Sequence, residues 1–585
     1  MVAALAACST SEPITHDVVV EKNVEAPMRD GVVLRADVYR PDAEGAFPAL
    51  LQRTPYSKNA DGAADTFRDI ATHGYDVVVQ DTRGRYTSEG VTVPHDESQD
   101  GYDTVEWVAG LPYVNGRVGM WGGSYLATTQ LTAAAEAPPS LVAIAPSSSY
   151  TSRYDMVYQG GAFYLSDGLG WNLGQAADVR RRRNGVAFAR RDGPIGITRE
   201  QRETLRSEWL WRLPLLGFDE LDLEELAPGY RWMLEHPSYD DFWRTYDIGL
   251  RHERFRVPAL HTTGWYDTLL KGTLENFRGI RARAATPEAR EGQRLIVGPW
   301  THSRPSPESR SIGEVDFGPA AGLDYPALLL DWYGHWLKGE DTGVMETAPV
   351  RLFVMGTNEW RDEESWPLER AVPTRWYLHS DGGAGTDARD GRLDRERPTG
   401  AEPPDIYHYD PADPVPTGQF GGYSRSPADP TEIELRPDVL VYTSAPLQEA
   451  LEVTGYIELV LVASSSAPDT DFTGKLIDVA PDGTARTLTD GILRARYRDG
   501  FERPELLRPG VPTELRVDLL ATSNVFLPGH RIRVEVSSSN FPRFDRNPNT
   551  GAPFATGAET RVARQTIHHD ATHASYVVLP VVPGA

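Results

Sequence analysis

The sequence is poor in cysteine, in positive charge and in long apolar runs. Its single cysteine, Cys8, excludes a disulfide within the chain and any metal cluster built on cysteines. Acidic side chains outnumber Lys and Arg by 84 to 59, and the net charge of −25 argues against a nucleic-acid partner, which would need a basic surface. The one dense basic run, residues 180–183, is interpreted as a solvated face. No apolar run approaches the roughly 20 residues that cross a bilayer, so no transmembrane span is expected.

Residues 1–17 hold a candidate targeting signal. Residues 5–8 read Leu-Ala-Ala-Cys and are followed by Ser-Thr-Ser, which resembles the cleavage box and polar spacer of a bacterial lipoprotein. A signal peptide also needs a basic start and a longer apolar region, and residues 1–7 have neither. Either the true start lies upstream, or the pattern arises by chance in an Ala-rich stretch. We favour the upstream start, which predicts a lipid anchor at Cys8 and a bacterial cell-envelope or secreted protein. The alternative predicts a cytoplasmic one.

Short apolar strands alternate with helical segments in the first part of the chain. The expected strands lie at 17–21, 31–39, 47–52, 75–80, 117–121 and 141–145. The Val-rich run at 75–80 is typical of a strand that is buried on both faces. Alternation of this kind predicts a mostly parallel α/β sheet, in which sites lie at the carboxyl ends of the strands.

At 585 residues the chain is too long for one core, so several domains are expected. After about residue 150 the strand signals vanish, and helix-forming residues and tryptophans predict a helical cap. Strands resume at 257–263 and 294–297, before an amphipathic helix at 326–338. Later strands at 351–355, 457–462 and 531–536 alternate and are separated by turns, which predicts a β-sandwich. The predicted parts are an N-terminal segment (1–17), an α/β core (18–150 and 251–347), the cap (151–250) and the sandwich (348–585).

A candidate nucleophile lies where an apolar strand meets a helix. Gly122-Gly123-Ser124 sits at this junction and predicts a sharp turn with the serine at its apex. A serine hydroxyl becomes a nucleophile only where a base can take its proton, and such an elbow projects it into a site. The usual glycine two residues after the serine is absent, because Leu126 occupies that position and Ala127 is the small residue. Taken alone, the pattern fits a glycine turn before a helix equally well.

An acid and a histidine follow Ser124 in the order that a serine hydrolase on an α/β sheet requires. Asp267 and His302 each follow a predicted strand and a glycine. The histidine would take the serine proton, and the carboxylate would hold the imidazole in the right tautomer. Asp267 also fits a simple loop cap, and His335 is interpreted as a packing residue. The ordered set of three favours catalysis.

A developing oxyanion needs positioned hydrogen-bond donors. The backbone N–H of Tyr125, directly after the candidate nucleophile, is the expected first donor. The loop after an early strand carries Tyr56, whose hydroxyl is the candidate second donor. Tyr56 also fits the simpler interpretation of a packed aromatic beside a proline.

The chain resembles the cocaine-esterase (CocE/NonD) family of α/β-hydrolases, which is related to X-prolyl dipeptidyl-peptidases and α-amino-acid ester hydrolases. The matching stretches are RTPY at 53–56, DTRGR at 81–85, GGSYL at 122–126, HPSYDDFW at 236–243, GWYD at 264–267, GPWTH at 298–302, SSSAPDTDF at 464–472 and SSSNFPR at 537–543. The resemblance covers nearly the whole chain, from about residue 18 to the C-terminus.

The resemblance implies a hydrolase core, a helical cap and a jelly-roll. It implies Ser124 as nucleophile, Asp267 and His302 as its partners, and the Tyr56 hydroxyl and Tyr125 N–H as oxyanion donors. No metal or organic cofactor is implied. The substrate pocket is expected to include four side chains, Trp171, Trp265, Leu269 and Phe420. Ala127 departs from the glycine that relatives often carry, and Leu269 would change the shape of the pocket.

These observations predict a serine hydrolase that cleaves small-molecule carboxylic esters through an acyl-enzyme, with small amides as a further substrate class. The alternative is an X-Pro dipeptidyl-peptidase or an α-amino-acid ester hydrolase or acylase, which needs carboxylates to anchor a substrate amine. The acidic run at 220–225 could supply them but fits a solvated helix face better. The least favoured alternative is a non-catalytic jelly-roll binding protein. Assembly into a homo-oligomer stays open.

Overall fold

The computed structural model describes residues 15–60, 62–92, 97–184, 198–303, 305–386, 388–418 and 425–584. The chain divides into two compact units. The first unit consists of residues 1–146, 254–258 and 327–344, and the second of residues 147–253, 259–326 and 345–585. Residues that the sequence separates widely thus share a unit.

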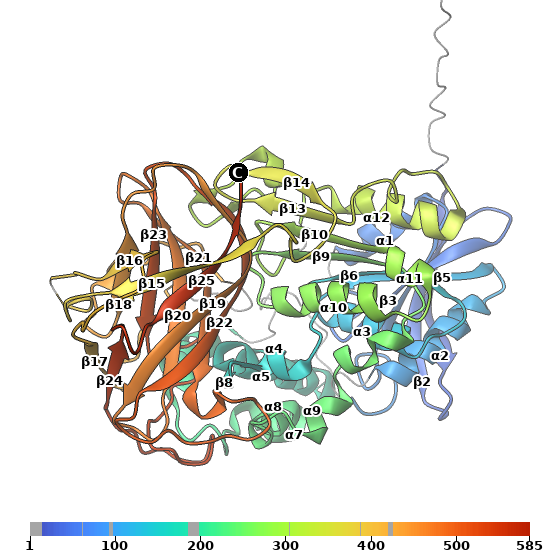
Figure 1. Ribbon diagram of the computed structural model, residues 1–585. Coiled ribbons are helices and arrows are strands. Elements are labelled where there is room, and N and C mark those ends of the chain that lie inside the picture. Colours follow the sequence, from blue (N-terminus) through green and yellow to red (C-terminus); the bar gives the residue numbers. More distant parts are fainter. Residues whose placement is uncertain are drawn as a thin grey trace, which may run out of the picture. The chain divides into compact units, whose positions relative to one another are not determined.

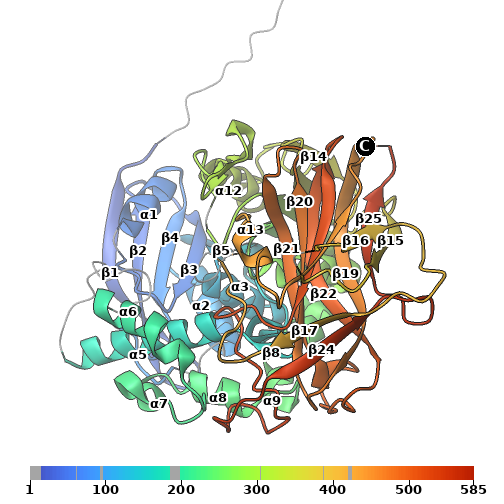
Figure 2. The same ribbon diagram turned by 90° about the vertical axis from the view of Figure 1, so that its left-hand side faces the viewer.

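The first unit is built on a sheet whose strands follow the order β1-β2-β4-β3-β5-β6. Figure 2 shows its first four strands with helix α1 against them. The pairs β1–β2 and β2–β4 are antiparallel, whereas β3 runs parallel to both β4 and β5. Every residue of β4 is buried, as the sequence predicts. The elements are β1 (Val18–Pro27), β2 (Val33–Pro41), β3 (Phe47–Thr54), α1 (Ala63–Thr72), β4 (Asp76–Asp81), α2 (Ser98–Ala109), β5 (Val114–Gly123), α3 (Tyr125–Ala135), β6 (Leu141–Ser147) and α12 (Tyr325–Tyr333).

The second unit contains further α/β elements. Strand β9 pairs in parallel with β10, β10 pairs in parallel with β13, and β14 closes this set antiparallel to β13. The expectation that strand 351–355 belongs to the sandwich is therefore wrong. Its buried Leu352 and Val354 suit a sheet covered on both faces as well as they suit a sandwich. The elements are β9 (Ala259–Gly264), α10 (Leu270–Arg283), α11 (Pro287–Glu291), β10 (Gln293–Gly298), β13 (Val350–Val354) and β14 (Glu359–Glu363).

Helices dominate the part of the second unit between residues 151 and 250. They share an aromatic core in which Tyr154 stacks on Tyr158 and meets Trp243 edge to face. The basic run at the end of α5 forms ion pairs with exposed carboxylates, which fits the predicted solvated face. The helices are α4 (Arg153–Val157), α5 (Leu165–Arg183), α6 (Arg199–Ser207), α7 (Leu223–Leu226), α8 (Gly229–Glu235) and α9 (Asp241–Thr245).

The rest of the second unit is a β-sandwich, drawn from yellow to red in Figure 1. Its long pairings are antiparallel, as in β19–β22 and β20–β21. One hydrophobic core runs from Trp265 and Leu270 through Phe353 to Leu459 and Val534, so it joins the α/β elements of this unit to the sandwich. The strands are β15 (Val372–His379), β16 (Arg392–Asp394), β17 (Asp405–Tyr409), β18 (Leu440–Ser444), β19 (Leu451–Ser465), β20 (Asp471–Val479), β21 (Ala485–Arg494), β22 (Thr513–Phe526), β23 (Arg531–Ser537), β24 (Ala563–His568) and β25 (Tyr576–Val582). The fold is the predicted α/β-hydrolase type with a C-terminal sandwich.

Candidate active site

Ser124 occupies a strained turn between β5 and α3. Its backbone has φ 60° and ψ −123°, a region that residues with a side chain rarely adopt. Strand β5 ends at Gly123 and the helix begins at Tyr125, so the serine stands at the junction itself. Gly122 has φ 134°, and a Cβ atom there would lie 2.7 Å from Cβ of Leu126. The glycine is needed because helix and strand approach each other so closely.

The two tyrosines expected to serve the oxyanion lie in the same unit as Ser124. The rings of Tyr56 and Tyr125 meet edge to face with centroids 6.3 Å apart. Tyr56 is partly exposed, whereas Tyr125 is 4% exposed and its hydroxyl donates to Oε1 of Glu97 at 2.8 Å. The N–H of Tyr125 lies in the first turn of an 11-residue helix, where the helix dipole favours negative charge.

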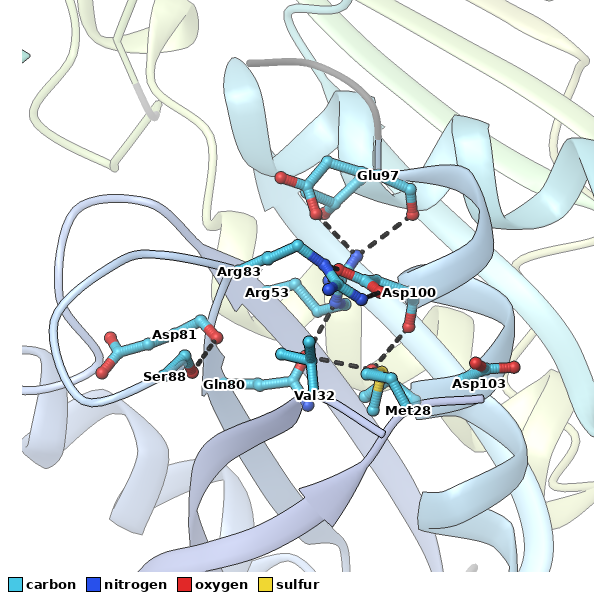
Figure 3. Close-up of polar contacts among 12 residues, drawn as sticks. Met28, Val32, Arg53, Gln80, Asp81, Arg83, Ser88, Glu97, Asp100 and Asp103 are labelled. Carbon is cyan, nitrogen blue, oxygen red and sulfur yellow. Dashed lines mark hydrogen bonds and ion pairs between the residues drawn. The ribbon is translucent and has the colours of Figure 1, made fainter. Parts of the chain in front are cut away.

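A buried charge network centred on Arg53 contacts Tyr125 through Glu97, and Figure 3 shows the Arg53 and Glu97 side chains of this network. The fully buried guanidinium of Arg53 donates to Gln80 at 2.8 Å and pairs with the Glu97 carboxylate at 3.0 Å. The Glu97 carboxylate therefore pairs with the Arg53 guanidinium and accepts a hydrogen bond from the Tyr125 hydroxyl. Arg53 and Tyr56 belong to the same short stretch, so one ion pair links the loop of Tyr56 to the start of α3. Sequence reasoning missed Glu97, because nothing in the sequence distinguishes it from other surface-type acids.

A second set of contacts fixes the loop after β3. The Arg85 guanidinium donates to the carbonyl of Pro55 at 3.0 Å, directly before Tyr56. Asp81 accepts hydrogen bonds from the backbone N–H and the ammonium of Lys58 at 2.8 and 3.2 Å. Through Arg85 and Asp81, the DTRGR stretch therefore holds the loop that contains Pro55 and Lys58.

Asp267 and His302 lie together in the second unit. Oδ1 of Asp267 is 3.0 Å from Nδ1 of His302. The carboxylate is fully buried and also accepts hydrogen bonds from the Ser148 hydroxyl at 2.5 Å and the Leu269 N–H at 2.7 Å. Burial acts to raise the pKa of Asp267, but the charge of His302 and these hydrogen bonds lower it below its ordinary value. The carboxylate is therefore held ionised and in one orientation.

The environment of His302 favours its protonated form. Burial acts to lower the pKa of His302, but the charge and hydrogen bond of Asp267, together with the charge of Asp167, raise it above its ordinary value. This is the electrostatic setting that a general base needs in order to hold a proton taken from a nucleophile.

Two residues near this pair were not predicted. Ser148, which has φ 51°, donates to Asp267 from the turn after β6, and the triple serine at 147–149 gave no sign of it. Asp167 lies in the first turn of α5, 9% exposed, and its Oδ1 accepts no hydrogen bond from the described residues. Burial raises the pKa of Asp167 to about 6 against the charges of Arg543 and His302.

The four predicted pocket residues differ in how deeply they are buried. Trp265 is fully buried, and its indole N–H donates to the carbonyl of Phe353 at 2.8 Å, so it packs in the hydrophobic core, and its contact with substrate stays a prediction. Trp171 is partly exposed on α5, and Leu269 is 6% exposed at the start of α10. Their contact with substrate stays a prediction. Phe420 and Cys8 lie outside the described residues, so the pocket role of the first and the lipidation of the second stay predictions.

The described ranges hold no group of three or more His, Cys, Asp or Glu side chains arranged to bind a metal ion. Within the same ranges, no helix is both long and apolar enough to cross a bilayer.

Comparisons with known proteins identify the family of this chain. Residues 30–304 match the X-Pro dipeptidyl-peptidase (S15) family, and residues 342–578 match the C-terminal non-catalytic domain of X-Pro dipeptidyl-peptidases. A cocaine esterase from Rhodococcus sp. (strain MB1 Bresler) is 40% identical over 96% of this chain and 98% of its own length.

Two solved structures are similar over nearly their whole length. An aminopeptidase from the marine sediment archaeon Thaumarchaeota archaeon is 27% identical, covers 100% of this chain and 99% of its own, and has a TM-score of 0.82. An α-amino-acid ester hydrolase is 25% identical, covers 98% and 100%, and has a TM-score of 0.80. The matches extend across catalytic and C-terminal parts alike, and the chain therefore belongs to the cocaine-esterase (CocE/NonD) family of α/β-hydrolases and is a serine hydrolase.

Proposed function

We propose that the protein hydrolyses carboxylic esters through an acyl-enzyme, with Ser124 as nucleophile, His302 as general base and Asp267 as the acid that orients it. The observation that carries the proposal is the strained backbone of Ser124 at the strand–helix junction, which packing alone does not require. The Asp267–His302 hydrogen bond of 3.0 Å supports it from the second unit.

Each proposed step assigns a proton to a named atom. Because Asp267 accepts from Nδ1–H, Nε2 of His302 is the atom left to take the Ser124 proton as Oγ attacks the ester carbonyl. His302 then returns that proton to the leaving alcohol, and water repeats the sequence on the acyl-enzyme. Asp267 stays ionised throughout and stabilises the imidazolium.

The oxyanion is proposed to lie against the Tyr125 N–H and the Tyr56 hydroxyl. The position of Tyr125 at the positive end of α3 supports the first donor. The hydrogen bond from the Tyr125 hydroxyl to Glu97 and the Arg53–Glu97 ion pair support a fixed geometry for both residues. Donors fixed in advance stabilise a transition state without reorganisation.

The ion pairing of the acidic run at 220–225 favours ester hydrolysis over dipeptide release. A dipeptidyl-peptidase would need carboxylates that are available to a substrate ammonium. Four carboxylates of this run each form an ion pair with an arginine, in the pairs Glu220–Arg212, Asp222–Arg180, Glu224–Arg231 and Glu225–Arg183. These pairs support the solvated-face interpretation.

The test compares p-nitrophenyl acyl esters with Ala-Pro-p-nitroanilide and an amino-acid ester, using wild type and Ser124→Ala. Wild type should turn over the acyl esters fastest, and Ser124→Ala should lose about 10³-fold or more in kcat. A fluorophosphonate should label wild type and Ser140→Ala, a control serine directly before β6, but not Ser124→Ala. Activity of Ser124→Ala within about tenfold of wild type would contradict the assignment of Ser124 as nucleophile. Faster release of Ala-Pro would establish the peptidase alternative.

A further inference from the structure

The two oxygens of the Asp267 carboxylate have different donors. Oδ1 accepts from Nδ1 of His302 at 3.0 Å and from the Leu269 N–H at 2.7 Å. Oδ2 accepts from the Ser148 hydroxyl at 2.5 Å, and no other residue in the described ranges donates to it. The carboxylate is fully buried, and a buried charged oxygen that lacks a donor costs desolvation free energy. One of the two oxygens therefore depends on Ser148 alone.

The backbone around Ser148 is fixed from two sides. The N–H of Ser148 donates to the carbonyl of Thr262 in β9 at 2.7 Å. The N–H of the next residue, Ser149, donates to Oγ1 of Thr273 in α10 at 2.9 Å. Asp267 lies in the connection between β9 and α10. The Ser148 hydroxyl is thus anchored to the same two elements that carry the carboxylate.

The conformation of Ser148 is strained. Its φ of 51° lies in the left-handed region, which residues with a side chain rarely adopt and which glycine adopts freely. The residue is 5% exposed, and its hydroxyl makes a single side-chain hydrogen bond within the described part of the chain, the one to Asp267. Strain of this kind persists where surrounding contacts impose it, and it clusters at functional sites.

The hydroxyl also acts on the charge of the pair. Burial acts to raise the pKa of Asp267, whereas the charge and hydrogen bond of His302, the Ser148 hydroxyl and the Leu269 N–H lower it. Burial acts to lower the pKa of His302, whereas Asp267, and Asp167 from α5, raise it. Ser148 carries no charge, so it influences His302 through the Asp267 carboxylate.

We propose that Ser148 is a positioning residue, whose hydroxyl holds Oδ1 of Asp267 toward His302 and lowers the affinity of the Asp267–His302 pair for a proton. Since these two residues act as acid and base only under the proposed function, the role of Ser148 rests on that function. The hydroxyl stabilises negative charge on Oδ2. Without it, more of that charge acts on the imidazolium, so the pair takes up a proton at higher pH.

The test measures kcat and kcat/KM of the intact protein against pH with a p-nitrophenyl acyl ester, followed at the isosbestic wavelength of nitrophenol. Ser148→Ala and Ser148→Gly both remove the hydroxyl. Each should lose about tenfold in kcat, because a carboxylate that can turn no longer holds the imidazole, while KM changes little. The acidic limb of kcat/KM should move to higher pH by about half a unit or more.

The matched control is Ser152→Ala. The hydroxyl of Ser152 is buried and has no hydrogen-bond partner among the residues that the structure describes, so this variant should keep the kcat and the acidic limb of wild type. A purely structural defect lowers kcat without moving the limb. An acidic limb that stays in place in both Ser148 variants, or that moves to lower pH, would therefore overturn the proposal.

The two Ser148 variants separate the hydroxyl from the strained backbone. Because glycine adopts a φ of 51° freely and alanine does not, Ser148→Gly should melt at a higher temperature than Ser148→Ala. Per folded molecule, the kinetics of the two variants should nevertheless agree. If Ser148→Gly behaves as wild type while Ser148→Ala is impaired, strain explains the loss and the proposal is wrong.

Asp267→Asn distinguishes a failure of this role from a failure of the proposed function. If Asp267→Asn is impaired and the Ser148 variants match wild type, the role of Ser148 alone is refuted. If Asp267→Asn keeps the turnover of wild type, the acid itself is misassigned. In the Asp267→Asn background, Ser148→Ala should change kcat by less than about twofold, because its effect requires the carboxylate. A further tenfold loss there would contradict a role that acts through Asp267.

Discussion

The two units hold their candidate catalytic groups by different means. In the first unit, backbone geometry positions Ser124: a glycine with φ 134°, a serine with φ 60° and the first turn of α3. In the second unit, side-chain hydrogen bonds position Asp267, which contacts His302, Ser148 and the N–H of Leu269. One group depends on a local turn, and the other depends on partners that lie up to 119 residues away in the sequence.

Because of this difference, we expect substitutions to disrupt the candidate catalytic groups of the two units in different ways. A strained turn tolerates changes outside the turn, because its geometry depends on Gly122, Ser124 and the first turn of α3. A buried carboxylate with several partners fails when any charge or donor around it changes. The predictions below test this contrast, from the largest effect to the smallest.

Asp267→Asn should cause the largest loss in the second unit. The amide keeps the shape of the side chain but favours the wrong tautomer of His302, which costs about 10⁴-fold in kcat in a well-studied triad. Steady-state kinetics near neutral pH, expressed per folded molecule, should show this loss. Asp240→Asn is the control, because Asp240 caps α9 through the Phe242 N–H at 3.1 Å and pairs with His236. If Asp240→Asn is the inactive variant, the acid is misassigned.

Tyr56→Phe should cause the next largest loss, in the first unit. It removes one hydroxyl and almost no volume, so the fold should not change. If the hydroxyl donates to the oxyanion, kcat should fall by about 10²-fold or more while KM changes little. Tyr113→Phe, at the edge of β5, should leave kcat as in wild type. An unchanged kcat in Tyr56→Phe would make Tyr56 a packing residue.

Gly122→Ala should damage the elbow itself. The new Cβ would lie 2.7 Å from Leu126 Cβ in a backbone conformation with φ 134°, at a cost of about 1–3 kcal/mol. Because Ser124 is two residues away, kcat should also fall by about tenfold. Gly116→Ala is the matched control, since it has φ 85° and nothing within 4 Å of the added Cβ. Equal kcat values in the two variants would show that the close approach to Leu126 does not position the serine.

Asp167→Asn should produce the smallest effect, a shift of the pH profile. The charge of Asp167 raises the pKa of His302, so its removal should move the acidic limb of kcat/KM to lower pH, by a few tenths of a unit. Asp178→Asn, on the same helix, should leave the limb in place. A shift to higher pH would contradict the electrostatic role.

The pH dependence of the stability of Asp167→Asn also has a predicted direction. The pKa of Asp167 in the folded protein, about 6, exceeds its ordinary value of 3.8, so the folded state binds the proton more tightly than the unfolded chain. That contribution is fully present below pH 3.8 and is lost as the pH rises through about 6. The melting temperature of Asp167→Asn should therefore show a weaker decline than wild type over this interval.

The candidate site residues that the sequence predicted are those that stand in a recognisable local pattern. Ser124 stands in a Gly-x-Ser turn between a strand and a helix, and Asp267 follows a strand through a glycine, so position in the α/β alternation was enough. Ser148 and Asp167 act through contacts that form only when distant segments pack, and no spacing in the sequence distinguishes them from other polar residues. Strand β13 was assigned to the wrong sheet for a related reason: its residues fit either sheet, and only its parallel register with β10 decides.

The continuous core that joins Trp265 and Leu270 to the sandwich has a consequence for cooperativity. Since the same apolar side chains serve both parts, neither can open without exposing the other's interior to water. The loop of Asp267 and the strands of the sandwich should then lose hydrogen-exchange protection together, as one foldon. A region described in relatives as non-catalytic would, in this chain, set the free energy that keeps the acid and the base folded.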